Sequence, residues 1–482
     1  MSIKFNDLIF GKNDIRGKVG EDITPELYRR IGHAYAAYIR EKSATFTEAM
    51  WISVGYDARK HSPELTKALI DGLIESGINV YDLGLCPTPL CYFSEFRIPG
   101  VSGTLMVTAS HNPPEYNGLK MTYEKVILPE QEIAALRDLT RSGNFSTAET
   151  KGEYKKYDII TDYIDTLLND FENAGKGLKI VVDSANATGG VVGPELYEKM
   201  GCEVIELYSE PDGDFPNHHP NPSDPSTLND LKTKIAETVA DFGIAFDGDS
   251  DRIGIVDDKG NSLPGDQLML IFALDILNKT KGEKPTFVSE VKCSQLLYDT
   301  IEKHGGRAIM WKTGHGFIKS KMKEENALMA GEMSGHIFFR DRNFGYDDAV
   351  YAGCRFIEIV AEKKANDPNF SVFEFIKSFP QTFTSEEVRI PCPNEYKYKI
   401  VDDLQQEFSA KPDVFTNKIE KVITIDGVRL VFRDGFALIR ASNTEPVFTL
   451  RFEAGTQENL ANYREQMLQI VDNKLKDVKA VL

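Results

Sequence analysis

MWISVGYDARKHSPELTKALIDGLIESGINVYDLG, residues 50–84, has the clearest structural pattern in the chain. An apolar segment precedes a helical pattern that Ser62 opens, with Pro63 at its first helical position. Gly77 then separates this helix from a second apolar segment. Serine and proline are typical of helix starts, and glycine is typical of helix ends. The order strand, helix, strand predicts a βαβ unit.

The same order recurs twice, in residues 178–208 and 285–311, where Gly201 and Gly305 follow the helical segments. After about Pro380 the pattern changes. Residues 429–454 read as strands and turns, and residues 458–478 as an amphipathic helix. The sequence therefore predicts an α/β fold class, with three related α/β modules containing mixed sheets and a C-terminal α+β module.

The length of 482 residues also indicates several domains, since a domain usually has about 150 residues. Polar stretches near residues 142–156, 257–262 and 363–369 are the expected linkers. The predicted domains are 1–155 with a serine loop, 156–258 with an acidic loop, 259–372 with the segment GEMSGH and 373–482 with the segment RASNTEP.

The composition excludes several classes of protein. Lys and Arg number 56 against 74 Asp and Glu, a net charge of −18 that would repel nucleic acid and anionic membranes. Six scattered cysteines without a CxxC pair indicate neither a zinc knuckle nor a disulfide scaffold, which suits a reducing cytoplasm. The N-terminus does not read as a secretion signal, and the longest apolar run, Leu268 to Leu274, has seven residues. We expect a cytoplasmic monomer without nucleic-acid or membrane partners.

A serine follows an apolar strand in the segment from Thr104 to Met121, TLMVTASHNPPEYNGLKM. Ligands of doubly wound sheets lie at the carboxyl ends of strands, where Ser110 is expected. Ser110 is a candidate nucleophile beside His111, and two prolines stiffen its loop. The alternative is an ordinary turn serine, because serine, asparagine and proline are common in turns.

Three carboxylates alternate in the loop between the apolar segments 244–246 and 253–256. Asp247, Asp249 and Asp251 could together bind one hard cation. The alternatives are a solvated acidic turn and a calcium loop of the EF-hand type. The calcium loop requires glycine where Arg252 stands and glutamate where Asp258 stands, so the match is poor.

Four further segments combine polar side chains with tight turns. The segment 331–336, GEMSGH, has groups suited to sugar hydroxyls, and 440–446, RASNTEP, suits a phosphate because arginine binds oxyanions in a bidentate manner. Lys312 and His315 follow an apolar strand in 312–316, KTGHG, and Arg16 lies in 14–17, DIRG. Plain hairpin turns, and a structural histidine at position 315, are the alternative interpretations.

Together, these segments resemble the α-D-phosphohexomutase superfamily, and the whole chain is similar to its bacterial phosphomannomutase/phosphoglucomutase family. The resemblance covers all four modules and implies four domains around one cleft. It implies a phosphoserine at Ser110 and a Mg²⁺ site formed by Asp247, Asp249, Asp251 and that phosphoserine. Asn13 stands where relatives often have tyrosine before DIRG, so an aromatic contact there is not expected.

The resemblance also implies roles for other residues. Arg252 would steady the phosphate. The reacting centre would include Arg16, His111, Lys120 and His315. Substrate binding would involve the residues Lys292, Lys312, Glu332, Ser334, His336, Arg440, Ser442, Asn443 and Thr444.

The implied activity interconverts hexose 1-phosphate and hexose 6-phosphate through a hexose 1,6-bisphosphate, with glucose 1,6-bisphosphate as intermediate and activator. Glucose and mannose share O3 and O4, so a loop that holds these atoms would accept both sugars. Glucosamine phosphate would be an alternative substrate. Lys120, His315 or Arg16 could move the proton.

Two other functions fit part of the pattern. An aspartyl-phosphate phosphatase would use Asp247 or Asp249 as nucleophile, but it leaves TASHNP and RASNTEP without a role. A non-enzymatic sugar-phosphate-binding protein with a metal site would lack phosphate on Ser110.

Overall fold

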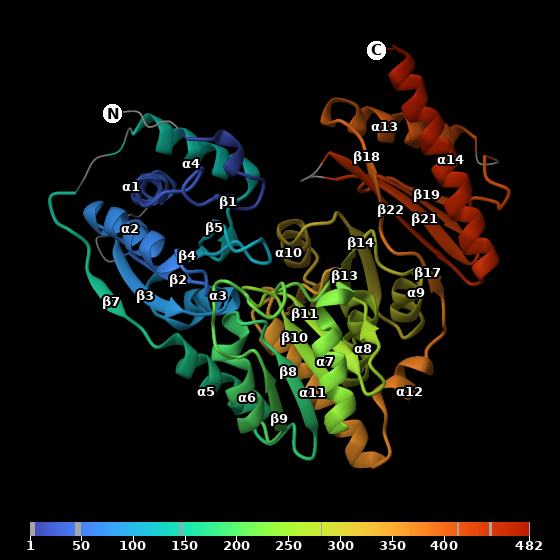
Figure 1. The fold of residues 1–482 in the computed structure, drawn as a ribbon, viewed down its shortest axis with the longest axis horizontal. Helices are drawn as coiled ribbons and strands as arrows, with labels where there is room; N and C mark the ends of the chain where they lie inside the picture. The colour runs from blue at the N-terminus through green and yellow to red at the C-terminus, as the bar shows by residue number, and fades with distance from the viewer. Residues whose placement is uncertain are drawn as a thin grey trace. The chain divides into compact units, whose positions relative to one another are not determined.

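The computed structural model of the chain (Figure 1) describes residues 5–43, 50–143, 145, 148–280, 282–411, 414–442 and 446–481. The chain forms two compact units, Met1–Leu268 with Ser334–Phe373, and Met269–Met333 with Glu374–Leu482. The units do not coincide with the four predicted domains, because part of residues 259–372 lies in each. The four boundaries remain a prediction.

The first sheet of the first unit is mixed. Its order is β1-β5-β4-β2-β3-β7, with β6 on β5. Strand β2 pairs in parallel with β3 and β4, whereas β5 is antiparallel to β4 and β1. The strands are β1 Ile15–Lys18, β2 Trp51–Tyr56, β3 Asn79–Leu85, β4 Val101–Val107, β5 Tyr116–Tyr123, β6 Val126–Ile127 and β7 Tyr154–Lys156.

The helices of this part enclose one apolar core with the sheet. Tyr35 of α1, Val54 of β2 and Leu69 of α2 are fully buried in it. The helices are η1 Asp7–Ile9, α1 Pro25–Lys42, α2 Ser62–Glu75, α3 Thr88–Arg97 and α4 Glu130–Ser142. The predicted βαβ unit is confirmed as β2, α2 and β3.

The start of α2 differs in detail from the expectation. The helix begins at Ser62, but the Ser62 hydroxyl donates to Asp57 Oδ1 at 2.6 Å and His61 occupies the N-cap without a side-chain hydrogen bond. Ser62 therefore ties the helix start to the end of β2. At the other end Gly77 has φ +75°, a left-handed conformation that suits glycine after a helix.

A second mixed sheet follows in the same unit, in the order β12-β11-β10-β8-β9. Strand β8 is parallel to β9 and β10, and β10 is antiparallel to β11. The strands are β8 Lys179–Asp183, β9 Glu203–Leu207, β10 Phe242–Phe246, β11 Ile253–Asp257 and β12 Ser262–Leu263. The acidic loop thus joins two antiparallel strands, which excludes the helix–loop–helix of an EF-hand.

The helical elements of this part are η2 Thr188–Val191, α5 Ile159–Phe171, α6 Gly193–Lys199, η3 Pro225–Leu228 and α7 Asn229–Thr238. The unit also contains β16 Ile337–Phe339 and α11 Ala349–Asn366 from later in the chain. Phe356 of α11 meets Phe242 of β10 edge to face, with ring centroids 4.9 Å apart. This contact joins α11 to the second sheet.

The third βαβ unit lies in the second compact unit. Strand β13 pairs in parallel with β14 and β15. Its elements are α8 Gly265–Lys279, which begins before the unit boundary, β13 Thr286–Glu290, α9 Gln295–Lys303, β14 Arg307–Trp311, α10 His315–Glu324 and β15 Met329–Gly331.

The C-terminal part of this unit is an antiparallel sheet of order β17-β22-β21-β20-β19, with β18 on β22. Its strands are β17 Phe383–Thr384, β18 Val388–Pro391, β19 Lys421–Ile423, β20 Val428–Phe432, β21 Gly435–Ala441 and β22 Val447–Ala454. Its helices are α12 Val372–Lys377, α13 Asn394–Ala410 and α14 Gln457–Val481. Leu404, Ile439 and Tyr463 share its core. The predicted α+β module is confirmed. Among the described residues, no helix combines the length and apolar character that crossing a membrane requires.

Candidate active site

Ser110 lies in the loop between β4 and β5 and is 1% exposed. Its Oγ donates to Asp247 Oδ2 at 2.8 Å and lies 3.1 Å from His111 Nδ1. Its backbone has φ +50°, a conformation that is uncommon for a residue with a side chain. Ser110 is therefore not a solvent-exposed turn serine, because it is buried and directed at the acidic loop.

The acidic loop between β10 and β11 brings its three carboxylates together. Asp247, Asp249 and Asp251 are fully buried, and one oxygen of each lies within 4.8 Å of the others. The loop folds around Asp247 Oδ1, which accepts the backbone N–H groups of Asp251 at 3.1 Å and Arg252 at 3.2 Å. A solvated acidic turn is therefore excluded.

Lys120 of β5 enters this cluster and donates to Oδ2 of both Asp249 and Asp251. Burial alone would lower the pKa of Lys120, but these two carboxylates outweigh burial and raise it. Burial would raise the pKa of Asp251, but Lys120 and His336 lower it to about 2. Burial and the charges of Asp251 and Asp249 raise the pKa of Asp247 to about 8. Lys120 thus meets two of the three carboxylates, whereas the nearest cation to Asp247 in the described part of the chain is Arg252, whose Nε lies 4.0 Å from Oδ2.

The donor set fits a hard divalent cation. Oδ1 of Asp249 and Oδ1 of Asp251 are buried and accept no hydrogen bond from the residues that the structure describes. Buried carboxylate oxygens without partners are costly unless a cation or another donor meets them. Mg²⁺ prefers oxygen ligands, commonly carboxylates together with a phosphate. The three aspartates are therefore a candidate metal site.

Cations surround the Ser110 loop. Arg16 of β1 donates to Asn112 Oδ1 at 2.7 Å and to the Ala109 carbonyl at 3.4 Å. The positive charge of Arg252, with burial and Arg16, lowers the pKa of His111 to about 2. His111 is thus neutral at physiological pH. The arginines give this acidic protein a local region suited to an anion.

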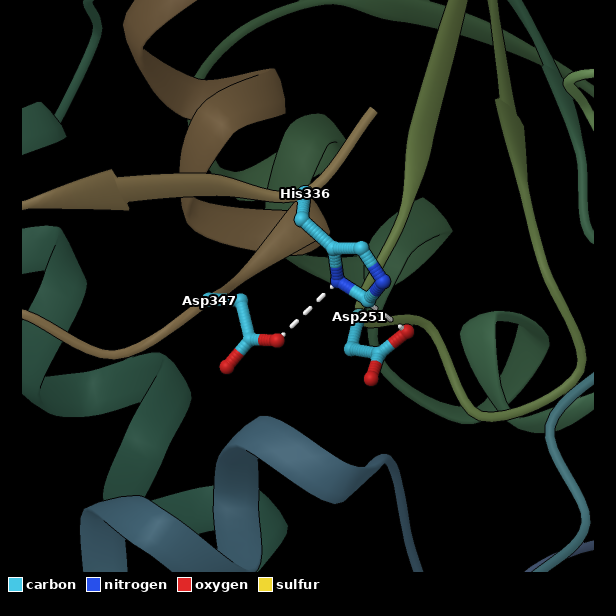
Figure 2. Close-up of side chains that lie close together, drawn as sticks. All are labelled: Asp251, His336 and Asp347. Atoms are coloured by element: carbon cyan, nitrogen blue, oxygen red, sulfur yellow. Dashed lines mark ion pairs between the residues drawn. The ribbon is translucent and has the colours of Figure 1, made fainter. Parts of the chain in front are cut away.

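His336 lies beside Asp347 and beside Asp251 of the acidic loop (Figure 2). It is 4% exposed, and its Nδ1 lies 3.0 Å from Asp347 Oδ2 and 3.7 Å from Asp251 Oδ1. Arg252 Nε donates to His336 Nε2 at 2.9 Å. His336 therefore connects Asp347 to Arg252 and to the acidic loop, a role that its position in a predicted sugar-binding loop does not indicate.

A second polar cluster lies in the second unit. Glu332 Oε1 accepts the Gly314 N–H at 2.6 Å, and Glu290 accepts the Met333 N–H at 2.8 Å and the Thr313 hydroxyl at 2.6 Å. These bonds join the loops KTGH and GEMSGH.

Asp426 connects the same cluster to RASNTEP. Its Oδ2 accepts the Thr313 N–H at 2.9 Å, and it also accepts Arg440 Nε at 3.0 Å and lies 2.8 Å from Arg440 Nη2. Arg440 thus has a fixed orientation before any ligand binds.

The remaining predicted residues divide between the units. Lys292 lies 3.6 Å from Glu290 and 3.8 Å from Glu387, Lys312 is exposed, and His315 begins α10. Ser442 is buried, and its carbonyl accepts Lys397 Nζ at 2.5 Å. Ser334 belongs to the first unit, where its carbonyl accepts the Ser223 hydroxyl at 3.0 Å. Asn443 and Thr444 lie outside the described residues.

The sequence analysis missed several residues of these clusters: Arg59, Thr88, Glu290, Asp347 and Asp426. The Thr88 hydroxyl donates to Asp249 Oδ2 at 2.5 Å, and the Thr88 N–H donates to the Asp249 carbonyl at 2.9 Å. Arg59 and Thr88 follow β2 and β3, at the same strand ends as Ser110. Their positions just after predicted strands could have identified Arg59 and Thr88 as site residues. No comparable sequence pattern marks Asp347 or Asp426.

Gly248 allows the two loops to meet, and its replacement tests this packing. A Cβ at this position would lie 2.3 Å from the Ser110 carbonyl oxygen. We expect Gly248→Ala to destabilise the fold by about 1–3 kcal/mol, because overpacked backbone cannot relax freely. The thermal unfolding midpoint measures this. Gly455→Ala is the control, since its nearest neighbour is a side-chain atom of Asp434 at 3.3 Å. Equal midpoints for the two variants would contradict the close packing.

Comparison with known proteins assigns all four parts of the chain to one family. Residues 7–146, 161–260 and 264–379 match the phosphoglucomutase/phosphomannomutase alpha/beta/alpha domains I, II and III, and residues 387–470 match the C-terminal domain. A phosphomannomutase/phosphoglucomutase of Pseudomonas putida is 42% identical over 96% of both chains. A phosphoglucomutase of Neisseria meningitidis is 41% identical over 96% of this chain and 97% of its own.

The fold agrees with a solved structure. A phosphoglucomutase/phosphomannomutase family protein of Burkholderia thailandensis superposes with a TM-score of 0.88 at 35% identity, over 98% of both chains. Sequence, domain order and fold thus agree along nearly the whole length. The chain, in which a buried serine faces three buried aspartates, belongs to the phosphoglucomutase/phosphomannomutase family.

Proposed function

We propose that this enzyme interconverts the 1-phosphates and 6-phosphates of mannose and glucose through a phosphoserine at Ser110. The observation that carries the proposal is the 2.8 Å hydrogen bond between Ser110 Oγ and Asp247 Oδ2 inside the buried aspartate cluster. A serine oxygen beside a candidate metal site is suited to holding and donating a phosphoryl group.

The reaction would have two transfers. In the first, the bond between phosphorus and Ser110 Oγ breaks, a bond to the free sugar hydroxyl forms, and the hydroxyl proton leaves. The hexose 1,6-bisphosphate then turns over, and its other phosphoryl group returns to Ser110. Lys120, His315 and Arg16 remain the candidates for moving the proton. His111, adjacent to Ser110 and neutral, is available as a hydrogen-bonding partner of the serine oxygen.

Asp247, Asp249 and Asp251, together with the phosphate on Ser110, would hold Mg²⁺. When bound, this ion would neutralise charge on the phosphoryl oxygens. Arg252 would steady the phosphate, since its guanidinium is held by His336 near Asp247. Arg16, held by Asp14 at 2.7 Å, would bind a second oxyanion near the same loop.

The contacts to the rest of the substrate are also proposed. Glu332 and Ser334 would hold O3 and O4, with Lys292, Lys312 and His336 as further predicted binding residues. Arg440, Ser442, Asn443 and Thr444 would bind the phosphate that does not react. Since O3 and O4 are common to glucose and mannose, both sugars should be substrates.

The proposed setting is the cytoplasm, with a monomer acting on small sugar phosphates and with glucose 1,6-bisphosphate as activator. The six cysteines support a reducing compartment, because all are buried and none forms a disulfide among the residues that the structure describes. The net charge of −18 supports the expectation that nucleic acid is not a partner.

A coupled assay of the purified chain tests the function. Mannose 1-phosphate, glucose 1-phosphate and glucosamine 1-phosphate would be supplied separately with Mg²⁺ and a trace of glucose 1,6-bisphosphate. We expect turnover of the first two. Absence of turnover with both would contradict the proposed function, and preference for glucosamine 1-phosphate would correct its substrate.

Arg440→Ala should raise KM about tenfold to a hundredfold, because a charge-assisted hydrogen bond contributes about 1.5–3 kcal/mol to binding. Steady-state kinetics on glucose 1-phosphate would measure it. Arg389→Ala is the matched control, since Arg389 is a surface arginine of the same sheet that pairs with Glu387. An unchanged KM in the Arg440 variant would mean that RASNTEP is only a turn.

A further inference from the structure

Arg59 is a buried arginine in the first unit, three residues after the end of β2. Its side chain is 0% exposed. All five N–H groups of its guanidinium have acceptors, an arrangement that leaves none for a substrate. The acceptors are Asp57 Oδ2 at 3.0 Å for Nε, the carbonyls of Pro113 at 2.6 Å and Tyr116 at 3.0 Å for Nη1, and those of Ser110 at 2.9 Å and Asn112 at 2.6 Å for Nη2.

Four of these acceptors are backbone carbonyls between Ser110 and Tyr116, in the loop that carries Ser110 and at the start of β5. This loop contains Pro113 and Pro114, which have no backbone N–H and cannot donate the hydrogen bonds of a regular strand. A carbonyl buried without a donor destabilises the fold, and a rigid planar donor can satisfy several at once. The guanidinium therefore supplies four hydrogen bonds that help to shape this segment.

The hydrogen bond from Arg59 to the Ser110 carbonyl also affects the position of the Ser110 side chain. Ser110 has φ +50°. This left-handed conformation is unfavourable for a residue with a side chain, so neighbouring contacts must stabilise it. Its carbonyl accepts from Arg59 and lies against Gly248, where a Cβ would be only 2.3 Å away. With the carbonyl held in this place, Oγ meets Asp247 at 2.8 Å.

Arg59 is itself held in place. Asp57 accepts its Nε, and the other oxygen of Asp57 accepts the Arg59 N–H at 3.1 Å and the Ser62 hydroxyl at 2.6 Å. The ring of Phe215 covers the guanidinium at 5.4 Å. Through Asp57 and Arg59, the start of α2 therefore holds the loop that carries Ser110 in place.

We propose that Arg59 is a positioning residue for phosphoryl transfer, which sets the location of Ser110 Oγ through the loop backbone and never touches the substrate. This inference rests on the proposed function, since it concerns the same serine. It predicts an effect on the transfer step with substrate binding retained. Lysine should not replace arginine here, because one ammonium group cannot reach four carbonyls.

The test is single-turnover transfer from enzyme carrying labelled phosphate on Ser110 to glucose 1-phosphate. We expect Arg59→Lys to slow transfer about a hundredfold, because small misplacements of reacting groups have effects of this size. The KM for glucose 1-phosphate should stay within about twofold. The control is Arg355→Lys, which removes an equally buried guanidinium that pairs with Asp341 in the same unit. It should transfer at the wild-type rate even if its thermal midpoint falls.

Transfer by Arg59→Lys within about twofold of wild type, or an equal loss in Arg355→Lys, would overturn the positioning role. If Arg59→Lys does not fold, Asp57→Asn replaces it in the test. This substitution weakens the ion pair that holds the Arg59 guanidinium and leaves the arginine in place. It should also slow transfer without raising KM, and an unchanged rate would overturn the proposal. A wild-type enzyme that transfers no label would instead refute the proposed function.

Discussion

Ser110→Ala should abolish mutase turnover, with a loss of at least about a thousandfold, because the variant has no oxygen to accept and return the phosphoryl group. The same coupled assay measures it. Binding should persist, since the proposed contacts with the non-reacting phosphate lie elsewhere. Isothermal titration with glucose 1-phosphate would show an affinity close to that of the wild type.

A second substitution separates chemistry from backbone strain. Alanine at φ +50° keeps the strain of a left-handed residue, whereas glycine relieves it. Ser110→Gly should therefore be as inactive as Ser110→Ala and no less stable. Near-normal activity in either variant would rule out the phosphoserine mechanism. Activity lost in Ser110→Ala and recovered in Ser110→Gly would mean that the loop conformation, and not the hydroxyl, is required.

Removal of divalent metal should have the second large effect. Excess chelator should lower turnover about a thousandfold, because the lost charge stabilisation amounts to several kcal/mol and each about 1.4 kcal/mol corresponds to tenfold in rate. Mg²⁺ in excess over the chelator should restore activity. Full activity in chelator would refute the metal assignment.

Matched variants locate this metal. Asp249→Asn removes a carboxylate whose Oδ1 is buried and has no hydrogen-bond partner in the described part of the chain. It should raise the Mg²⁺ concentration for half-maximal activity by at least about tenfold. Asp257→Asn is the control, because Asp257 is equally buried at the far end of β11 and its Oδ1 is occupied by the N–H groups of Lys259 and Asn261. Equal metal dependence in the two variants would place the ion elsewhere.

Much of the fold was predictable because its signals are local. Proline and glycine restrict the backbone wherever they stand, so Pro63 and Gly77 mark the helix of residues 62–75 in any context. Apolar segments of strand length on either side then require the βαβ arrangement that β2, α2 and β3 adopt. The same reasoning identified the later modules and the antiparallel C-terminal part.

The site was predictable where short segments concentrate unusual chemistry. Three aspartates between two apolar strands predict a cation site, because such charges repel each other without one. Ser110 was identifiable because it closely follows an apolar strand, but the direction of its side chain was not. Only the fold brings it 2.8 Å from Asp247, 137 positions later in the chain.

The rest depends on contacts between segments far apart in the sequence. Nothing in YDAR reveals that Arg59 binds four carbonyls beyond position 109, and nothing in GYDD reveals that Asp347 holds His336. A charged side chain reads as solvated until the fold removes water from it, and only then must each of its hydrogen bonds be met by the protein. Composition and local pattern thus determined the modules and identified the reactive side chains. Burial in the tertiary structure decided which other residues, such as Arg59 and Asp347, hold those side chains in position.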